Sequence, residues 1–269
     1  MLRVRTLVVV SVVCLFVAGA AGCAPAFKVP AANADFDYQI GGVYPPPAGV
    51  AVVSRDRDAA PAAGVYNVCY VNGFQAQTED EQWWLTNHPT LVLRDAAGQP
   101  VKDTDWNELI LDISTSTKRT QLAAIVGGWI AKCGTDGFQG VEVDNLDTYA
   151  RAGNGSNGLP RLTPDHAVAY VRLLSDRAHG AHLALGQKNA ADLVPRRTEM
   201  GSNFAIAEEC NHYNECDSYT AGYGANVFVI EYARSDFDKG CRDWPGLSIV
   251  LRDRDVQPAG SPDYVRAAC

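Results

Sequence analysis

Basic residues are scarce in this 269-residue chain. It has 23 lysines and arginines against 31 aspartates and glutamates, and its formal net charge is −8. A nucleic-acid-binding domain neutralises phosphates with clustered basic side chains. The composition therefore argues against nucleic acid and anionic membrane surfaces as partners. An acidic field instead concentrates cationic ligands.

Several familiar catalytic motifs are also missing. The sequence has no Gly-x-Ser-x-Gly elbow, no Walker loop and no His-Glu-x-x-His, which removes the usual support for serine hydrolases and zincins. A Gly-x-Gly-x-x-Gly match at residues 153–158 lies well past the preceding strand-like run, so it does not predict nucleotide binding. With 47% hydrophobic residues, 24 glycines and 14 prolines, the chain is neither collagen-like, coiled-coil nor disordered. We expect a globular protein without a cofactor or metal.

A long hydrophobic run occurs only near the start. Residues 7–17 are apolar apart from Ser11, follow Arg3 and Arg5, and precede small residues up to Cys23. This run is short for a membrane span and typical of a secretory signal, although an uncleaved anchor helix is an alternative. The stretch before Cys23 also resembles a bacterial lipobox, with Ala20 where leucine is usual, so lipidation of Cys23 stays open. We expect a secreted or extracytoplasmic protein. Only the signal segment or a lipid anchor would bring it into contact with a membrane.

The expected organisation is a signal peptide at residues 1–22, an Ala/Pro-rich linker at 23–35 and a single monomeric domain at 36–269. Export favours disulfides over thiol catalysis or zinc binding. Six cysteines follow Cys23, and 15 pairings are possible. The short loop favours Cys210 with Cys216, and Cys241 with Cys269 would tie down the C-terminus. Cys69 then pairs with Cys133. A metal site at Cys210, His212 and Cys216 would lack a fourth ligand.

Strand-like and helix-like runs alternate through the domain. The strand-like runs are residues 37–40, 50–53, 65–71, 109–113, 138–143, 182–186, 204–207 and 227–230, with a further one at 247–251. One helix is expected over 117–132 with Gly134 as its stop, and another with Thr163 as N-cap, Pro164 in the first turn and an end near Gly180. Eight such units predict an α/β fold, a (β/α)8 TIM barrel. An open doubly wound sheet is the alternative.

Carboxylates end several of the expected strands. Glu142 and Asp144 are two residues apart and therefore lie on one side of a strand. Glu208 and Glu209 end another strand, and Glu231 ends a third. Active sites of TIM barrels form at these strand ends, and buried acids are costly without partners. Either a catalytic carboxylate pair or a structural hydrogen-bond network accounts for them, and Asp144 and Glu208 are the favoured functional residues.

Other polar side chains fall near the same strand ends. A ring of this kind suits a sugar, and its members are Asp37, Gln39, Asp56, Tyr70, Asn72, Asp112, Asn145, Lys188, Asn189 and Tyr232. Lys188 is interpreted as a salt-bridge partner or hydroxyl ligand in preference to a Schiff-base nucleophile. Trp83 and Trp84 fit sugar stacking and an amphipathic helix on the barrel equally well.

Together, these segments resemble the endo-α-1,4-polygalactosaminidase family, glycoside hydrolase family 114. The matching segments are residues 37–40, 66–70, 111–113, 137–147, 187–189, 207–210 with 215–216, and 230–232. The most specific element pairs Glu-x-Asp-Asn-x-Asp at 142–147 with Glu-Glu-Cys-x5-Cys at 208–216. The resemblance implies a TIM-barrel glycosidase whose catalytic aspartate and glutamate fall on Asp144 and Glu208. Relatives carry Asn-Glu-Gln-Cys where this chain has Ala207-Glu208-Glu209-Cys210, so Glu209 competes for the acid/base role.

The resemblance implies an endo-acting glycosidase of α-1,4-linked galactosamine polymers, and together with the signal-like start and the acidic composition it leads us to expect an exported, retaining enzyme acting on a cationic polymer. Asp144 would be the nucleophile and Glu208 the acid/base, with carboxyl groups about 5–5.5 Å apart. The polar ring, with Glu142, Glu209 and Glu231, would bind the substrate. A non-catalytic carbohydrate-binding barrel and a hydrolase of another α-linked glycan are the alternatives.

Overall fold

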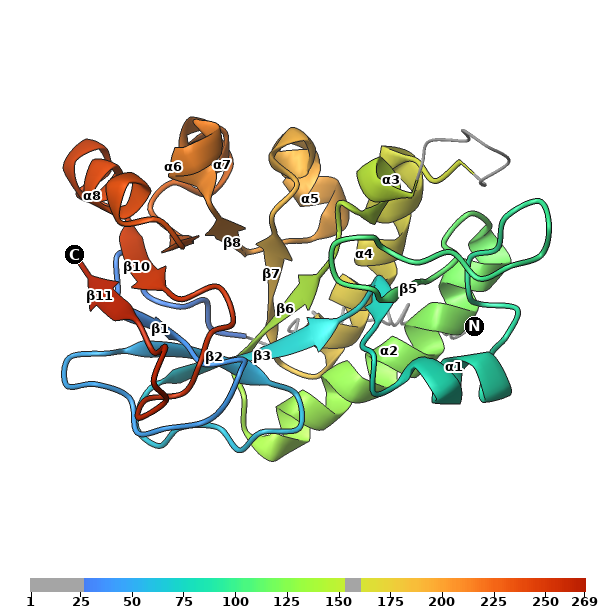
Figure 1. Cartoon of the computed structure of the whole chain (residues 1–269), viewed down its shortest axis with the longest axis horizontal. Coiled ribbons are helices and arrows are strands. Elements are labelled where there is room, and N and C mark those ends of the chain that lie inside the picture. Colours follow the sequence, from blue (N-terminus) through green and yellow to red (C-terminus); the bar gives the residue numbers. More distant parts are fainter. Residues whose placement is uncertain (1–26, 153–160) are drawn as a thin grey trace, which may run out of the picture.

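Eight parallel strands surround the centre of the molecule in a nearly closed barrel (Figure 1). The computed structural model describes residues 27–152 and 161–269. Each strand pairs with the next, and β10 lies beside β1. The barrel strands are β1 (Phe36–Tyr38), β2 (Val52–Asp56), β3 (Tyr66–Asn72), β6 (Gly140–Asp144), β7 (Ala184–Lys188), β8 (Phe204–Glu208), β9 (Val227–Glu231) and β10 (Ser248–Arg252). The predicted (β/α)8 TIM barrel is confirmed.

Helices lie outside the barrel along the part from β3 to β10, whereas loops alone connect β1 to β2 and β2 to β3 (Figure 1). The two longest, α2 and α4, pack against each other. A further strand, β11 (Arg266–Ala268), pairs antiparallel with β10. The helices are α1 (Glu81–Asn87), α2 (Ser116–Asp136), α3 (Thr148–Arg151), α4 (Pro164–Gly180), η2 (Ala191–Arg196), α5 (Arg197–Met200), α6 (Cys210–Tyr213), α7 (Cys216–Tyr223) and α8 (Arg234–Asp243).

One expected barrel strand lies elsewhere. The run at residues 109–113 contains β5 (Leu109–Ile110), which pairs antiparallel with β4 (Gln75–Ala76) in a separate two-stranded sheet. The run expected as an additional strand, residues 247–251, is the eighth barrel strand instead. A short apolar run does not reveal which sheet it joins, because a local pattern is the same in both settings.

The two expected helices are present with one corrected boundary. Thr163 caps α4 by accepting a hydrogen bond from the His166 backbone N–H, and the helix ends at Gly180 as predicted. In α2 the stop is Gly137, with φ 100°, rather than Gly134. A Cβ at Gly134 would lie 2.8 Å from the Ala181 carbonyl oxygen, so this glycine serves close helix packing.

The interior of the barrel is apolar at the end where the strands begin. Phe36, Phe204 and Phe228 pack there with ring centroids 5.3 to 6.1 Å apart. A Cβ on Gly186 of β7 would lie 2.7 Å from the Phe204 ring, so only glycine leaves room for this ring. The large aromatic side chains thus fill the base of the barrel, as the fold requires.

Residues 27–35, part of the expected linker, lie across this base. The Phe27 ring stacks on His179 at 4.4 Å. The Tyr66 hydroxyl donates to the Lys28 carbonyl at 2.7 Å, and Asn226 donates to the Pro30 carbonyl at 3.0 Å. These partners stand at or near the beginnings of barrel strands or at the end of α4. The segment is therefore part of the folded body.

The three expected disulfides are confirmed. They join Cys69 with Cys133, Cys210 with Cys216, and Cys241 with Cys269. The first ties β3 to α2, the second closes the loop between α6 and α7, and the third ties the C-terminus to α8. The expected signal peptide, Cys23 and the Gly-rich match at 153–158 lie outside the described residues. Within the described part, no helix is both long and apolar enough to cross a membrane.

Candidate active site

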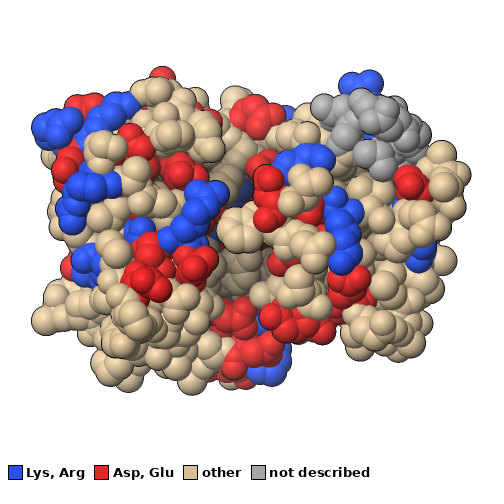
Figure 2. Space-filling view, viewed as in Figure 1, with Lys and Arg blue, Asp and Glu red and all other residues tan. Residues whose placement is uncertain are grey.

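An acidic cavity opens at the ends of the barrel strands. Its volume is about 790 Å³, within the range of small-molecule sites. Figure 2 shows the surface hollowed near the middle of one face, with acidic side chains on several sides. Nine carboxylates line the cavity against two guanidinium groups: Asp105, Glu108, Asp144, Asp147, Asp192, Glu208, Glu209, Glu215 and Asp255, with Arg151 and Arg254.

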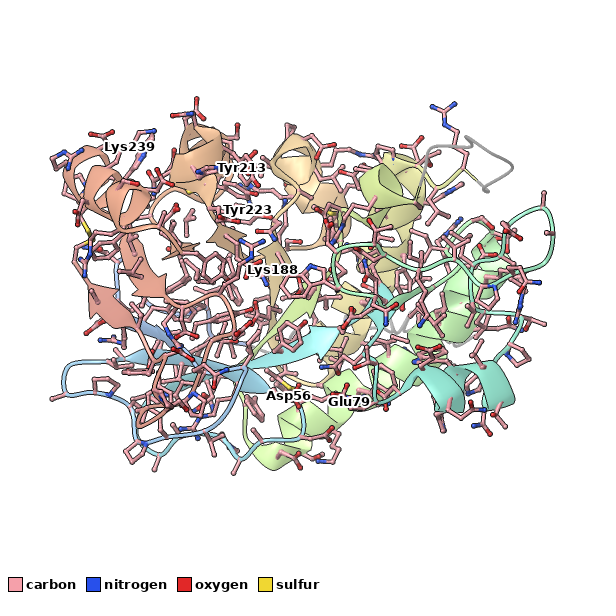
Figure 3. The ribbon with its side chains drawn as sticks, viewed as in Figure 1. Asp56, Glu79, Lys188, Tyr213, Tyr223 and Lys239 are labelled. Atoms are coloured by element: carbon pink, nitrogen blue, oxygen red, sulfur yellow. A yellow bond between two sulfur atoms is a disulfide. The ribbon has the colours of Figure 1, made fainter. Side chains whose placement is uncertain are left out.

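The ammonium group of Lys188 lies beneath the floor of this cavity. Lys188 ends β7 near the centre of the barrel (Figure 3) and is 1% exposed. Its Nζ lies 3.3 Å from Asp144 Oδ1, 3.3 Å from Glu208 Oε2 and 2.9 Å from the Tyr38 hydroxyl. Burial disfavours the charged form, yet these carboxylates raise the pKa of Lys188 well above its ordinary value. Lys188 is therefore a cation.

Asp144 is held in its ionised form. Burial opposes this, but the Lys188 ammonium, the Asn145 backbone N–H and the Tyr70 hydroxyl together lower the pKa of Asp144. The Asn145 N–H donates to Oδ1 at 2.8 Å, and the Tyr70 hydroxyl donates to Oδ2 at 2.9 Å. A carboxylate held by three donors next to a cavity is a ready nucleophile or base.

Glu208 stands across Lys188 from Asp144 and is held by two neighbours. Asn189 Nδ2 donates to Glu208 Oε2 at 3.1 Å, and the Tyr232 hydroxyl donates to Oε1. Because both catalytic candidates have an oxygen 3.3 Å from the same nitrogen, these two oxygens are at most about 6.6 Å apart. This upper limit is compatible with the retaining spacing of about 5–5.5 Å between carboxyl groups.

A third carboxyl group lies deeper on the same strand as Asp144. Glu142 is fully buried, accepts a hydrogen bond from Ser54 and has its Oε2 4.0 Å from Lys188 Nζ. Burial raises the pKa of Glu142 to about 7, although Lys188 and Ser54 act in the opposite direction. Glu142 does not line the cavity. The predicted same-face placement of Glu142 and Asp144 is present, but the two residues lie at different depths.

The three strands that carry these residues end in the same way. Asn145, Asn189 and Glu209 directly follow the inward-pointing charged residue, and their φ angles are 65°, 50° and 57°. Asparagine is enriched in this left-handed region, whereas a glutamate there indicates local strain of order 1 kcal/mol or more. A change of backbone direction thus ends each strand immediately after its functional side chain.

Glu209 points to the rim, away from Lys188. Its Oε2 lies 3.3 Å from Arg254 Nη1, and its backbone N–H donates to the Ile230 carbonyl at 2.8 Å. Glu231 supports the same turn from β9, since its Oε1 accepts from the backbone and side-chain nitrogens of Asn211 at 2.9 and 3.0 Å. The geometry therefore separates Glu208, at the centre, from Glu209, at the edge.

The polar ring expected from the sequence divides into two groups. The residues that line the cavity are Tyr70, Asp144, Asn145, Asn189, Glu208, Glu209 and Tyr232. Those that lie outside its lining are Asp37, Gln39, Asp56, Asn72, Asp112, Glu142, Lys188 and Glu231. Most of the second group make internal contacts, which explains their burial.

Asp37, Asp112 and Asn72 illustrate the internal contacts made by the residues outside the cavity lining. Asp37 accepts from Gln39 at 2.8 Å and from Arg266 at 3.0 Å in a buried ion network beside β1. Asp112 pairs with Lys118 at the start of α2. Asn72 accepts from Asn145 at 3.0 Å, so it braces a cavity residue from behind.

Of the two interpretations of Trp83 and Trp84, the structure supports the amphipathic helix packed on the barrel. Trp84 is fully buried in the core that α1 shares with α2, and the Trp83, Trp84 and Trp129 rings pack together at 5.1 to 6.4 Å. Neither Trp83 nor Trp84 lines the cavity.

Sequence reasoning missed several cavity residues that sit on loops or helix ends. They are Trp106, Glu108, Tyr149, Arg151, Asp192, Tyr213, Glu215 and Arg254. An aromatic residue inside a polar loop, such as Trp106 in Asp-Trp-Asn-Glu, was the available signal. No group of histidine, cysteine, aspartate and glutamate side chains suited to hold a metal ion occurs among residues 27–152 and 161–269.

A TIM barrel with two carboxylates facing a sugar-sized cavity at its strand ends defines the class of glycoside hydrolases. The model of glycoside hydrolase family GH114 matches residues 18–269, and the chain belongs to this family. No curated protein matched the chain.

Two solved structures share the fold. The crystal structure of Aspergillus fumigatus Ega3 in complex with galactosamine has a TM-score of 0.70 at 20% identity, covering 91% of this chain and 98% of that chain. The glycoside hydrolase domain of PelA from Pseudomonas aeruginosa has a TM-score of 0.52 at 13% identity, covering 84% and 96%.

Proposed function

We propose that this chain is an extracytoplasmic, endo-acting hydrolase of α-1,4-linked galactosamine polymers that retains anomeric configuration. The observation that carries the mechanism is the placement of Asp144 and Glu208 on one buried ammonium group, with oxygens at most about 6.6 Å apart. Family membership and the galactosamine named with Ega3 support the substrate class. The three disulfides support an oxidising compartment.

The charge of the cavity fits this substrate. A deacetylated galactosamine polymer carries an ammonium group on each sugar, and nine carboxylates line the cavity. Such a field raises the local concentration of a polycation. A fully N-acetylated polymer lacks these charges, so we expect it to be the poorer substrate.

In the first step, Asp144 attacks the anomeric carbon while Glu208 gives its proton to the leaving glycosidic oxygen. The bond from the anomeric carbon to that oxygen breaks, and a covalent glycosyl-enzyme forms on Asp144. In the second step, Glu208 takes a proton from water, whose oxygen displaces Asp144 from the anomeric carbon. The Tyr70 hydroxyl orients Asp144, and Tyr232 and Asn189 orient Glu208.

Lys188 positions this pair. As a buried cation in contact with both side chains, it favours ionised Asp144 and holds Asp144 and Glu208 in place. Because Lys188 lies beneath the cavity lining, it acts on the substrate through Asp144 and Glu208.

The test is hydrolysis of deacetylated and acetylated galactosamine polymers, with product sizing and NMR of the first-formed anomer. We expect internal cleavage and retained configuration. Asp144→Asn should lower turnover at least about 10³-fold without unfolding the protein, and Glu208→Gln should match it except with aryl glycosides whose leaving group needs no proton.

Glu209→Gln is the matched control, since it removes a neighbouring charge at the rim, and should lose only a few-fold. Inverted first product, or an active Glu208→Gln beside an inactive Glu209→Gln, would refute the assignment. Polymer binding with no cleavage would favour a carbohydrate-binding barrel.

A further inference from the structure

Two aromatic side chains on the cavity wall are exposed and have no assigned role. Trp106 is 51% exposed and Tyr213 is 62% exposed, and both line the cavity. The other aromatic residues of the lining, Tyr70, Tyr149 and Tyr232, each donate their hydroxyl to a carboxylate. Large apolar surface left open in an otherwise acidic cavity points to a ligand that covers it.

The loop that presents Trp106 is braced on both sides. Asp103, which is buried, accepts from the Asp105 backbone N–H at 2.8 Å and pairs with Arg151 at 2.9 Å. The Asn107 backbone N–H donates to the Asp103 carbonyl at 2.9 Å. The loop is thus held by its own hydrogen bonds and by Arg151, and it leaves about half of the Trp106 surface exposed.

The helix end that presents Tyr213 is also held. The Cys210–Cys216 disulfide closes the loop after α6, and the Tyr213 backbone N–H donates to the Glu209 carbonyl at 3.0 Å. Lys239 donates to the Asn211 carbonyl at 3.0 Å. Figure 3 shows Tyr213 nearer the edge of the molecule than Lys188.

The two aromatic residues enter the cavity from different sides. Trp106 belongs to the loop before Glu108, and Glu108 accepts from Asn72 at the end of β3 at 2.8 Å. Tyr213 follows β8. Trp106 is thus presented from beside β3 and Tyr213 from the segment after β8, and the strands that carry Asp144 and Lys188 lie between these two places in the sheet.

We propose that Trp106 and Tyr213 are stacking positions for sugar rings beyond those joined by the bond that is cut. A pyranose ring offers a C–H face to an aromatic ring, and its edge carries polar groups. Carboxylates line the cavity close in sequence to each ring, Asp105 beside Trp106 and Glu215 near Tyr213. A hexosamine stacked on either ring would have its ammonium group within the acidic field.

This inference rests on the proposed function and makes affinity depend on chain length. In an Asp144→Asn background, calorimetry with galactosamine oligosaccharides of increasing length should show tighter binding for longer chains. Trp106→Ala and Tyr213→Ala should each remove part of this gain, about five- to thirty-fold, while the shortest oligosaccharide binds unchanged. Trp106→Phe and Tyr213→Phe should retain most of it.

Trp83→Ala is the control, because Trp83 is 41% exposed but lies outside the cavity. If the wild-type chain cleaves polymer and Trp106→Ala and Tyr213→Ala match Trp83→Ala on long chains, the stacking inference alone is wrong. If long chains bind with the expected dependence on both rings but the wild-type chain cuts nothing, the stacking holds and the proposed hydrolysis is wrong. If both rings affect the shortest oligosaccharide equally, the inference is also wrong.

Discussion

The two ends of the barrel interior are built from opposite chemistry. At the base, the Phe204 and Phe228 rings pack among other apolar side chains, and residues 27–35 cover them. At the mouth, Asp144 and Glu208 meet the Lys188 ammonium beside an open cavity. Burying a charged group destabilises the fold even when the charge is paired. Burying apolar surface stabilises the fold. Apolar burial at the base therefore stabilises the fold, whereas the buried charges at the mouth destabilise it. We expect mutations at the base to lower stability and mutations at the mouth to change activity or raise stability.

The largest effect is expected at the base, on stability. Phe204→Ala removes a fully buried ring that Gly186 makes room for. We expect a loss of about 3–5 kcal/mol in the free energy of unfolding, with turnover per folded molecule unchanged, measured by urea unfolding and active-site titration. Val29→Ala, at the same end but exposed, should change stability by no more than about 0.5 kcal/mol. A turnover defect in folded Phe204→Ala would contradict the division between the two ends.

At the mouth, Glu142 should make the free energy of unfolding depend on pH. Its pKa is raised to about 7 in the folded chain and is about 4.3 in an unfolded one. Between these values the folded state holds a proton that the unfolded state has lost, so stability falls as pH rises through this window. Glu142→Gln imitates the protonated group, so the free energy of unfolding should rise relative to wild type by up to about 3–4 kcal/mol between pH 4 and 8.

Urea unfolding of both proteins across this range measures the difference. Glu108, whose pKa is also raised to about 7, is present in both proteins and its contribution cancels. Parallel stability curves would show that Glu142 is ionised in the folded chain.

Lys188→Met should move the acid limb of the rate profile. Without the ammonium, only the Asn145 N–H and the Tyr70 hydroxyl oppose the effect of burial, so the pKa of Asp144 should rise. The acid limb of kcat/KM should then shift upward by about one pH unit or more, with a fall of about 10- to 100-fold near neutral pH. Tyr38→Phe removes only a hydroxyl that accepts from Lys188 and should cost less than about threefold. A folded Lys188→Met with an unmoved acid limb would exclude the positioning role.

Salt should have the smallest effect, and only at the mouth. Raising ionic strength from low to about 0.5 M screens exposed charges, so kcat/KM on a deacetylated polymer should fall several-fold while the rate on a neutral aryl glycoside stays constant. Thermal unfolding in the same buffers serves as the control. Equal rates on the charged polymer at all salt concentrations would remove the electrostatic contribution to binding.

The sequence predicted the barrel and the central carboxylates because both depend on local patterns. Asp144 and Glu208 end strand-like runs, and side-chain alternation assigns Glu142 and Asp144 to one face. The depth of each side chain within the barrel does not follow from a local pattern. Lys188 was expected as a salt-bridge partner or a substrate ligand. It is the salt-bridge partner of Asp144 and Glu208 and lies beneath the cavity. The stagger of neighbouring strands sets this depth and leaves no local pattern in the sequence.

The rim was less predictable than the centre. Trp106 and Tyr213 lie on a loop and a helix end whose positions depend on contacts with residues distant in sequence, such as Arg151 and Lys239. The tryptophan pair was the stronger signal in the sequence, yet Trp84 belongs to the core. Composition alone does not show which exposed ring faces a cavity.

Residues 27–35, which cover the base of the barrel, would also set the orientation of the cavity relative to a membrane. Three residues separate Cys23 from Phe27, and an extended chain covers no more than about 3.6 Å per residue. A lipid on Cys23, which the sequence leaves open, would hold the base of the barrel within about 15 Å of a bilayer. Since the strands run from base to mouth, the cleft would then face outward, and a tethered enzyme would meet polymer in its surroundings rather than polymer lying along its own membrane.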